Sequence, residues 1–250
     1  MSGKNHHIYF ASDFHLGVPD HESSLVREKR IVRWLNKIEV NATEIYLMGD
    51  LFDFWFEYTY TAPKGYVRLL GKLAELSDLG VKIHLFTGNH DMWMFGYLQK
   101  ELNAEIHYAP ITKEYNGKKF YLAHGDGLGP GEYNYKFIKK IFANRFFQWC
   151  YARIHPNLAF GIANYLSARS RKKNHALDAQ YLGDEKEWLF QYCKEILKTE
   201  HYDYMIFGHR HLVLNKLIDK SRYINLGDWI KYNTYGYFDG ENFELIEFKG

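Results

Sequence analysis

Five short apolar runs along the chain are each followed at once by a cluster of polar residues. The runs, rich in the β-branched and aromatic residues that favour strands, are Ile8–Ala11, Ile45–Met48, Ile83–Phe86, Phe120–Ala123 and Tyr204–Phe207. Between the first three runs, apolar residues recur at helical spacing over 25–39 and over 65–79. This alternation predicts a layered α/β fold, with the polar clusters gathered along one edge of a sheet.

Further elements are predicted in the second half of the chain. Asn116-Gly117 lies between two strand-like runs and predicts a hairpin that delivers His124. The stretch 186–198 has helical spacing, and Asp239-Gly240 predicts a turn between two C-terminal strands. The C-terminal strand-like runs are Tyr223–Leu226, Thr234–Phe238 and Phe243–Phe248.

The segment from Tyr133 to Ala176 differs from the rest of the chain. It carries nine lysines and arginines and no aspartate or glutamate, so a formal net charge of +2 leaves about −7 on the remainder. Large apolar residues recur in it at helical intervals, among them Phe137, Ile141 and Trp149. We predict an inserted helical cap over about residues 128–180 of a single domain, 1–250. A helical hairpin that packs its apolar stripe on the core is the alternative interpretation.

Composition places the chain among globular proteins of a reducing compartment. It has 250 residues, 46% of them apolar, which is enough for one large domain. Cys150 and Cys193 have neither metal-type spacing nor a disulfide framework, which favours a cytoplasmic location. The apolar run at Ile8–Ala11 is too short for a signal peptide, and no run reaches transmembrane length. We therefore expect a soluble protein, or one attached to a membrane surface.

The polar clusters have the composition of a metal site. They are Asp13-Phe14-His15, Gly49-Asp50-Leu51-Phe52-Asp53, Gly88-Asn89-His90-Asp91, His124-Gly125-Asp126 and Gly208-His209-Arg210-His211. Histidine nitrogens combined with carboxylate oxygens suit manganese, iron or zinc better than calcium or magnesium. We predict two divalent ions bridged by Asp50. The expected ligands are Asn89, His124 and His209 for one ion, and Asp13, His15 and His211 for the other.

Four further aspartates have open roles. Asp53, Asp91 and Asp126 belong to the polar clusters, and each could contact metal, orient a ligand or cap a turn. Asp228 also follows a strand-like run, but we expect it to lie away from the site.

The order of these motifs resembles the calcineurin-like metallophosphoesterases, whose pattern is D-x-H, G-D-x-x-D, G-N-H-[DE], H and G-H-x-H. The resemblance implies two packed sheets flanked by helices, an α/β/β/α sandwich. It also implies a pair of ions that activates water for attack on phosphorus. Asn89 and His90 are the expected catalytic residues, with His90 placed to hydrogen-bond a phosphate oxygen or to protonate the leaving group.

A closer resemblance is to the UDP-2,3-diacylglucosamine hydrolase family of lipid A biosynthesis. It rests on the run from Gly49 to Trp55, on Tyr135 eleven residues after His124, and on the basic helical insert. The resemblance implies a manganese-dependent enzyme, peripheral on the cytoplasmic face of the inner membrane. Such an enzyme splits the pyrophosphate of its substrate into UMP and 2,3-diacylglucosamine 1-phosphate, and its cap holds the acyl chains.

Substrate contacts follow from the same resemblance. The candidates are Trp55, Tyr135, Arg169, Arg171, Lys172 and Lys173, of which the last four would bind phosphate or a headgroup. One departure is His90, where the best-known members have arginine, a permanent cation.

Two other functions fit parts of the sequence. A nuclease or nucleotide phosphoesterase would also use basic residues interleaved with aromatics. The aliphatic stripe favours lipid instead, so we expect no nucleic-acid partner. A non-catalytic scaffold of the same fold would tend to lose metal ligands, and none is lost here.

Overall fold

A computed structural model of the chain describes residues 6–130, 133–178 and 180–250; the side chains of residue 134 and of residues 168–178 are outside the description. The strands are β1 (Ile8–Ala11), β2 (Glu44–Leu47), β3 (Lys82–Phe86), β4 (Glu105–His107), β5 (Ile111–Tyr115), β6 (Lys118–Ala123), β7 (Tyr204–Phe207), β8 (Val213–Ile218), β9 (Ser221–Leu226), β10 (Thr234–Phe238) and β11 (Phe243–Glu247). The helices are α1 (His21–Ile38), α2 (Val67–Asp78), α3 (Tyr97–Glu101), α4 (Tyr133–Ala143), α5 (Arg145–Tyr151), α6 (Pro156–Asp178) and α7 (Trp188–Leu197).

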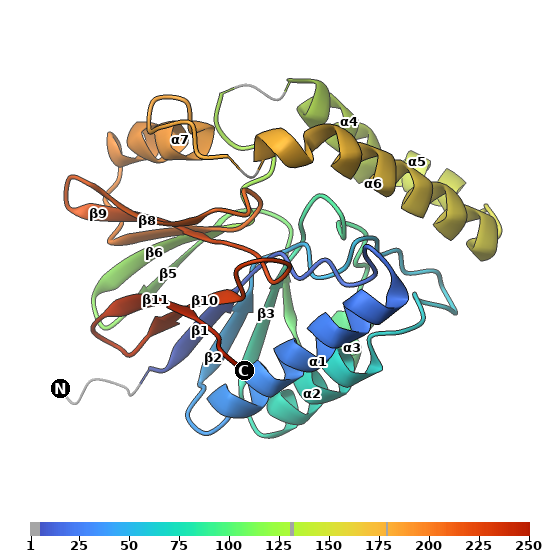
Figure 1. Cartoon of the computed structure of the whole chain (residues 1–250), viewed down its shortest axis with the longest axis horizontal. Coiled ribbons are helices and arrows are strands. Elements are labelled where there is room, and N and C mark those ends of the chain that lie inside the picture. Colours follow the sequence, from blue (N-terminus) through green and yellow to red (C-terminus); the bar gives the residue numbers. More distant parts are fainter. Residues whose placement is uncertain (1–5, 131–132, 179) are drawn as a thin grey trace.

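The strands form two mixed sheets that pack face to face, with helices on both outer sides (Figure 1). The first sheet has the order β11-β10-β1-β2-β3-β4, and the second has the order β5-β6-β7-β9-β8. β1 to β4 run parallel to one another, as do β6, β7 and β9. Helices α1 and α2 cover the first sheet and α7 covers the second. This is the α/β/β/α architecture that the motifs imply.

Three apolar clusters separate these four layers. Along β1, Ile8 and Phe10 enter the cluster between the sheets, whereas Tyr9 and Ala11 enter the cluster beneath α1. Successive side chains of a strand point to opposite faces, and here both faces are buried. The central strands are therefore continuous apolar runs rather than alternating ones, which is why they are easy to find in the sequence.

Most predicted elements are confirmed. The Asn116-Gly117 hairpin joins β5 to β6 as an antiparallel pair, and the turn at Asp239-Gly240 joins β10 to β11. The structure adds β4, β8 and α3, which the sequence pattern did not predict. β4 has three residues and α3 has five, so neither is long enough to show a period. Both strands are sheet edges: β4 pairs with β3, and β8 forms an antiparallel hairpin with β9.

The predicted cap segment folds into α4, α5 and α6, which lie across the top right of Figure 1, on the side of the molecule opposite α1 and α2. One side of these helices packs on core loops. Tyr151 stacks near Phe56 and Trp93, with ring centroids 4.8 and 4.9 Å apart, and Trp93 Nε1 donates to the Phe142 carbonyl at 2.9 Å. Ala159 is fully buried. These contacts attach the cap to the loops after β2 and β3.

Many large apolar side chains of the cap are nevertheless exposed. They are Phe137, Ile138, Phe142, Phe146, Phe147, Trp149, Leu158, Ile162, Tyr165 and Leu166. Phe146 is 64% exposed and Leu158 is 59% exposed, values unusual for residues of this size. Contiguous apolar surface of this kind marks an interaction site. The apolar stripe is thus only partly used for packing on the core. Among the described residues, no helix combines the length and apolar character that a membrane span needs.

Candidate metal centre

The predicted ligands come from loops at the carboxyl ends of β1, β2, β3, β6 and β7. Five of these residues have a left-handed backbone, with φ of 57° at Asp13, 43° at His15, 53° at Asp50, 67° at His209 and 51° at His211. Non-glycine residues seldom adopt this conformation, which costs about 1–3 kcal/mol each and is held by surrounding contacts. The chain turns sharply after each strand, and the turn aims the side chain at a common centre.

Two glycines of the motifs permit this close approach. A side chain at Gly88 would collide with the Asp50 carboxylate, and one at Gly208 would collide with Ser12 and Asp13. The backbone of one ligand loop thus lies directly against the side chain of another. The glycine before Asn89 and the glycine before His209 are therefore required by tertiary contact.

Asp13, His15 and His211 form the first ligand group. Their ligand atoms all lie within 4.8 Å of one another. His211 Nε2 is 3.3 Å from Asp13 Oδ1, and the Nε2 atoms of His15 and His211 are 3.1 Å apart. Ligands that share one ion have such spacings, because metal–nitrogen and metal–oxygen bonds are about 2.0–2.2 Å long.

Asp50, His124 and His209 form the second group. His124 Nε2 lies 3.4 Å from Asp50 Oδ2, and His209 Nδ1 lies 3.0 Å from Asn89 Oδ1. Asp50 Oδ2 is also 3.7 Å from His15 Nε2, so this carboxylate stands between the two groups. The seven residues predicted as ligands are thus brought together, and Asp50 lies between the two groups.

The unsatisfied nitrogens of the site fit metal binding. His15 Nδ1 and His124 Nε2 are buried without a hydrogen-bond partner among the described residues. The opposite nitrogen of His124, Nδ1, lies 2.7 Å from the Met48 carbonyl, which holds the proton on that side. The Nε2 lone pair of His124 is thereby directed at Asp50 and left for a cation. The donor set of histidine, carboxylate and amide fits two divalent ions.

The negative charges of the site's carboxylates favour protonation of its histidines in the absence of metal. Burial alone would lower the pKa of His124, but the nearby Asp50 carboxylate raises that pKa to about 10. His211 behaves alike: burial opposes protonation, while Asp13 and Asp228 raise its pKa to about 9. Burial would raise the pKa of Asp50, yet His124 and His90 hold it well below its usual range. Metal binding here would displace these protons.

Asp228 lies close to the site, contrary to our expectation. Its Oδ2 is 3.2 Å from His211 Nδ1, and its Oδ1 accepts hydrogen bonds from the backbone of Ile230 and Lys231. A carboxylate on the outer nitrogen fixes the orientation of a ligand histidine. The signal was present in the sequence, because Asp228 follows β9 as the other clusters follow their strands.

Asp91 and Arg210 hold the loops without joining the ligand groups. Asp91 is fully buried and accepts hydrogen bonds from the backbone of Gly88 at 2.8 Å and Leu51 at 2.7 Å, which ties two ligand loops together. Arg210, between the two histidines of its motif, is buried and pairs with Glu187 at 3.1 Å. This buried ion pair anchors the loop that carries both flanking histidines.

His90 links the centre to the cap. Its backbone N–H donates to Asp50 Oδ1 at 2.9 Å, and its Nδ1 lies 3.0 Å from the Asp53 carbonyl. Ser167 of α6 lies within 3.2 Å of the same Nδ1 and donates to Asp53 Oδ2 at 2.9 Å. The Nδ1 side of the ring is therefore anchored, which leaves Nε2 to meet a substrate. Nothing in the sequence distinguished Ser167.

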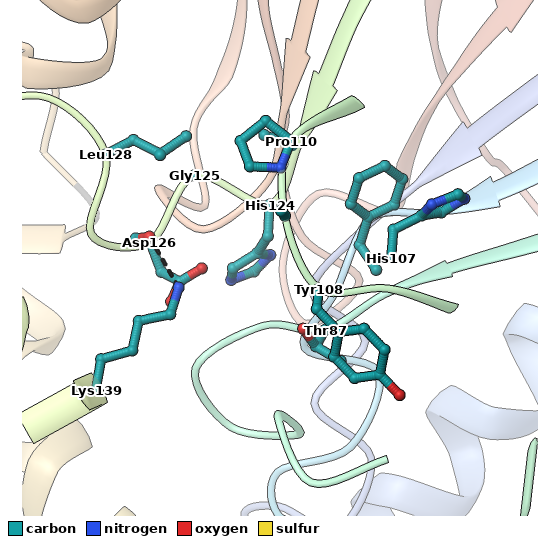
Figure 2. Close-up of a pocket in the computed structure, with 12 residues that line it drawn as sticks. Thr87, His107, Tyr108, Pro110, His124, Gly125, Asp126, Leu128 and Lys139 are labelled. Carbon is teal, nitrogen blue, oxygen red and sulfur yellow. Dashed lines mark hydrogen bonds and ion pairs between the residues drawn. The ribbon is translucent and has the colours of Figure 1, made fainter. Parts of the chain in front are cut away.

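Asp126 forms a second link to the cap. Figure 2 shows Lys139 reaching from α4 to Asp126, which lies two residues after His124 beside a small cavity. The Lys139 Nζ to Asp126 Oδ2 distance is 2.6 Å, and the Tyr135 hydroxyl also donates to this carboxylate. Burial would raise the pKa of Asp126, but His124 and Lys139 lower it. Asp126 thus positions Tyr135 and Lys139 at the edge of the metal centre.

The predicted substrate contacts lie at the edge of the metal centre, in the buried core and on α6. Tyr135 is at the edge of the centre, next to Asp126. Trp55 is fully buried, with its Nε1 donating to Glu57 at 3.0 Å, so a contact with substrate would need this packing to open. The others, on α6 with their side chains outside the described residues, are Arg169, Arg171, Lys172 and Lys173.

A cleft of about 440 Å³ separates α5 of the cap from the core loops. Its walls are largely aromatic, with Phe56 and Phe95 on the core side and Trp149 on the cap side, and Arg145 stands among them. The volume is in the range of small-molecule sites, about 300–1,000 Å³.

Residues 6–213 match the calcineurin-like phosphoesterase family. The chain belongs to this family. The resemblance drawn from its motifs is thereby confirmed, and with it a hydrolase that binds divalent metal. The identity of the metal is a separate question.

Curated relatives share a single name. The chain is 43% identical to a UDP-2,3-diacylglucosamine hydrolase of Porphyromonas gingivalis over 95% of this chain and 96% of that protein. It is 26% identical to a UDP-2,3-diacylglucosamine hydrolase of Hahella chejuensis, over 96% of each chain. The solved structure of an archaeal phosphodiesterase is similar over 97% of this chain and 99% of that one, with a TM-score of 0.49 and 15% identity.

Proposed function

We propose that this enzyme hydrolyses the pyrophosphate bond of UDP-2,3-diacylglucosamine, giving UMP and 2,3-diacylglucosamine 1-phosphate in lipid A biosynthesis. The observation that carries the proposal is the 43% identity to the Porphyromonas gingivalis hydrolase over nearly all of both chains, cap included. We also propose that the chain is one domain, with the cap at about residues 128–180. The metal ligands are those predicted, and manganese is the proposed ion, with iron or zinc as alternatives.

The residues of the centre support a hydrolytic mechanism. Two divalent ions, when bound, activate water for attack on phosphorus and neutralise charge on the phosphoryl oxygens. Asp50 lies between the two ligand groups and would fix their spacing. Asn89 is aligned by His209, and its amide would complete the second group. Each of these side chains is supplied by a different loop, so the geometry is set before substrate arrives.

His90 is the proposed proton donor and phosphate contact. Asp53 and Ser167 hold its Nδ1 side, so Nε2 is the atom that would carry the proton to a phosphate oxygen or to the leaving group. A histidine side chain can act as a proton donor at this position, which an arginine cannot do.

The cap supports a lipid substrate. Its exposed apolar residues lie beside the aromatic cleft, where acyl chains could be shielded from water. The nine basic residues of the cap segment would attract phosphate and anionic headgroups. We therefore propose peripheral association with the cytoplasmic face of the inner membrane. Tyr135 would contact substrate at the edge of the centre, and Arg169, Arg171, Lys172 and Lys173 would bind phosphate or headgroup.

Release of UMP tests the proposal directly. The purified enzyme is incubated with UDP-2,3-diacylglucosamine and manganese, and UMP is measured against an EDTA control. We expect metal-dependent release, and much slower release from UDP-N-acetylglucosamine, which lacks the acyl chains. Cleavage of DNA or of bis-aryl phosphates with none of the lipid would overturn the substrate assignment and support the nuclease alternative.

A further inference from the structure

A second cluster of potential ligands lies away from the centre, on β4, an edge strand of the first sheet, and on its neighbour β3. β3 pairs with β4 so that His84 is opposite Glu105 and Phe86 is opposite His107. Glu105 and His107 are two residues apart in a strand and share a face. His84 and His107 are buried, whereas the Glu105 side chain is 57% exposed, so the cluster can be reached from solvent.

The spacing within this cluster matches a tetrahedral ion. His84 Nδ1 lies 3.1 Å from His107 Nε2 and 3.2 Å from Glu105 Oε2. One ligand atom from each of the three residues falls within 4.8 Å of the others. Zinc bonds of 2.0–2.1 Å at tetrahedral angles separate neighbouring ligand atoms by roughly 3.3 Å. His84 Nδ1 therefore already lies at nearly the separation that one ion imposes from both His107 Nε2 and Glu105 Oε2.

The His84 ring lies between a buried carboxylate and the other two residues of the cluster. Its outer nitrogen, Nε2, is 3.3 Å from Glu44 Oε2. The opposite nitrogen, Nδ1, is the atom that faces His107 and Glu105.

Lys113 lies beside the cluster without entering it. Its ammonium is 3.8 Å from Glu105 Oε2, too far for a strong hydrogen bond. Glu105 Oε1 is also 3.8 Å from His107 Nδ1. A cation among His84 Nδ1, His107 Nε2 and Glu105 Oε2 would contact all three atoms.

The surroundings hold the cluster in a fixed geometry. The Tyr46 ring stacks on His84, with centroids 4.1 Å apart and planes within 4° of parallel. Glu44 accepts from the Tyr115 hydroxyl at 2.6 Å, so it is itself oriented. A carboxylate on the outer nitrogen of a histidine, with that carboxylate hydrogen-bonded in turn, is the usual support of a histidine metal ligand.

We propose that His84, Glu105 and His107 bind a third divalent ion, of the zinc class, with water completing the coordination. Two imidazoles and one carboxylate suit zinc better than calcium or magnesium. The ion would fasten β4, an edge strand of only three residues, to β3. The proposal rests on these side chains alone and does not depend on the substrate.

Zinc stoichiometry tests the site. The enzyme is first loaded with manganese, freed of excess metal and then titrated with zinc, with manganese content and turnover followed to detect exchange at the centre. We expect wild type to bind one more zinc per chain than His107→Ala or Glu105→Gln. Glu105 is exposed, so Glu105→Gln keeps the test valid even if His107→Ala fails to fold. Glu114→Gln, an exposed glutamate on β5, is the matched control and should keep the additional zinc.

Two further measurements locate the ion. Crystals soaked with zinc should show an anomalous peak between His84 Nδ1, His107 Nε2 and Glu105 Oε2. At a hundredfold excess of zinc over its Kd, the unfolding temperature of wild type should rise by roughly 5 °C more than that of Glu105→Gln. Equal zinc content in wild type and Glu105→Gln, or a peak elsewhere with none here, would overturn the proposal.

Discussion

The metal centre and the cap differ in almost every physical respect. The centre is made of buried polar groups: Asp13, Asp50 and His124 are each at most 3% exposed. The cap presents large apolar groups to solvent, with Phe146 64% exposed. Burying polar groups and exposing apolar ones both cost free energy, so each arrangement indicates a binding role. The centre fits divalent cations, and we propose that the apolar surface of the cap binds a lipid or a membrane.

Among the described residues, the two regions are joined by His90 with Ser167 and by Asp126 with Tyr135 and Lys139. We propose that the loops determine the reaction and that the cap determines the substrate. Substitutions in the centre should therefore remove turnover on any substrate. Substitutions on the outer cap should change only lipid recognition and membrane binding.

The largest effect is expected at the bridging position. Asp50→Asn keeps the volume but removes the charge shared by both ligand groups, so turnover should fall by about 10³-fold. Metal content, measured by mass spectrometry, should fall to at most one ion per chain. Asp78→Asn, at the exposed end of α2, is the control and should change neither. A variant at position 50 that keeps two ions would show that the carboxylate does not bridge.

The next effect is expected at His90. His90→Ala removes the proposed proton donor but none of the predicted metal ligands, so turnover should fall by roughly 10²-fold with both ions retained. Metal content and UMP release, measured on one preparation, separate these outcomes. His201→Ala removes an exposed histidine and should have no effect. Unchanged turnover in His90→Ala would exclude a catalytic role.

A smaller effect is expected on the outer cap. Phe146→Ser combined with Trp149→Ser removes two exposed aromatics, so binding to anionic vesicles should weaken by roughly tenfold. Sedimentation with phosphatidylglycerol-containing vesicles measures this, while manganese content stays normal. Val40→Ser, 84% exposed at the end of α1, is the control. Equal vesicle binding by wild type, the double variant and Val40→Ser would show that these exposed aromatics do not contribute to membrane association.

The smallest effect is expected where the regions join. Ser167→Ala removes the hydroxyl that contacts Asp53 and His90, and loss of about 1 kcal/mol of hydrogen bonding should lower kcat roughly fivefold. The change should fall on kcat rather than on metal content, because Ser167 acts through His90. Ser77→Ala, in α2, provides the comparison. If KM alone changed, Ser167 would serve substrate binding instead of positioning His90.

Much of the fold was accessible from the sequence because the central strands are buried on both faces. A run such as Ile45–Met48 is apolar without interruption, and the polar residues that follow it mark the end of the strand. The edge strand β4 carried no such signal. β4 contains a single apolar residue, Ile106, and is a strand only because β3 lies beside it.

The metal centre likewise contains residues that the sequence identified and residues that only the structure identified. Asp13, Asp50, His124 and His209 were identifiable because each follows a strand and the motifs recur in a fixed order. Ser167 and the ion pair of Arg210 with Glu187 were not, since their partners lie far away in the chain. Trp55 stands in the motif region, yet packing places it in the core.

The sequence by itself determined the layered fold, the family and the residues able to bind two ions, because local periodicity and short motifs are enough to identify each of these. Only the tertiary structure decided the distances between ligand groups, the orientation of His211 by Asp228 and the exposure of the apolar cap surface. Such features depend on which segments meet in space, and chain segments that meet need share no local pattern.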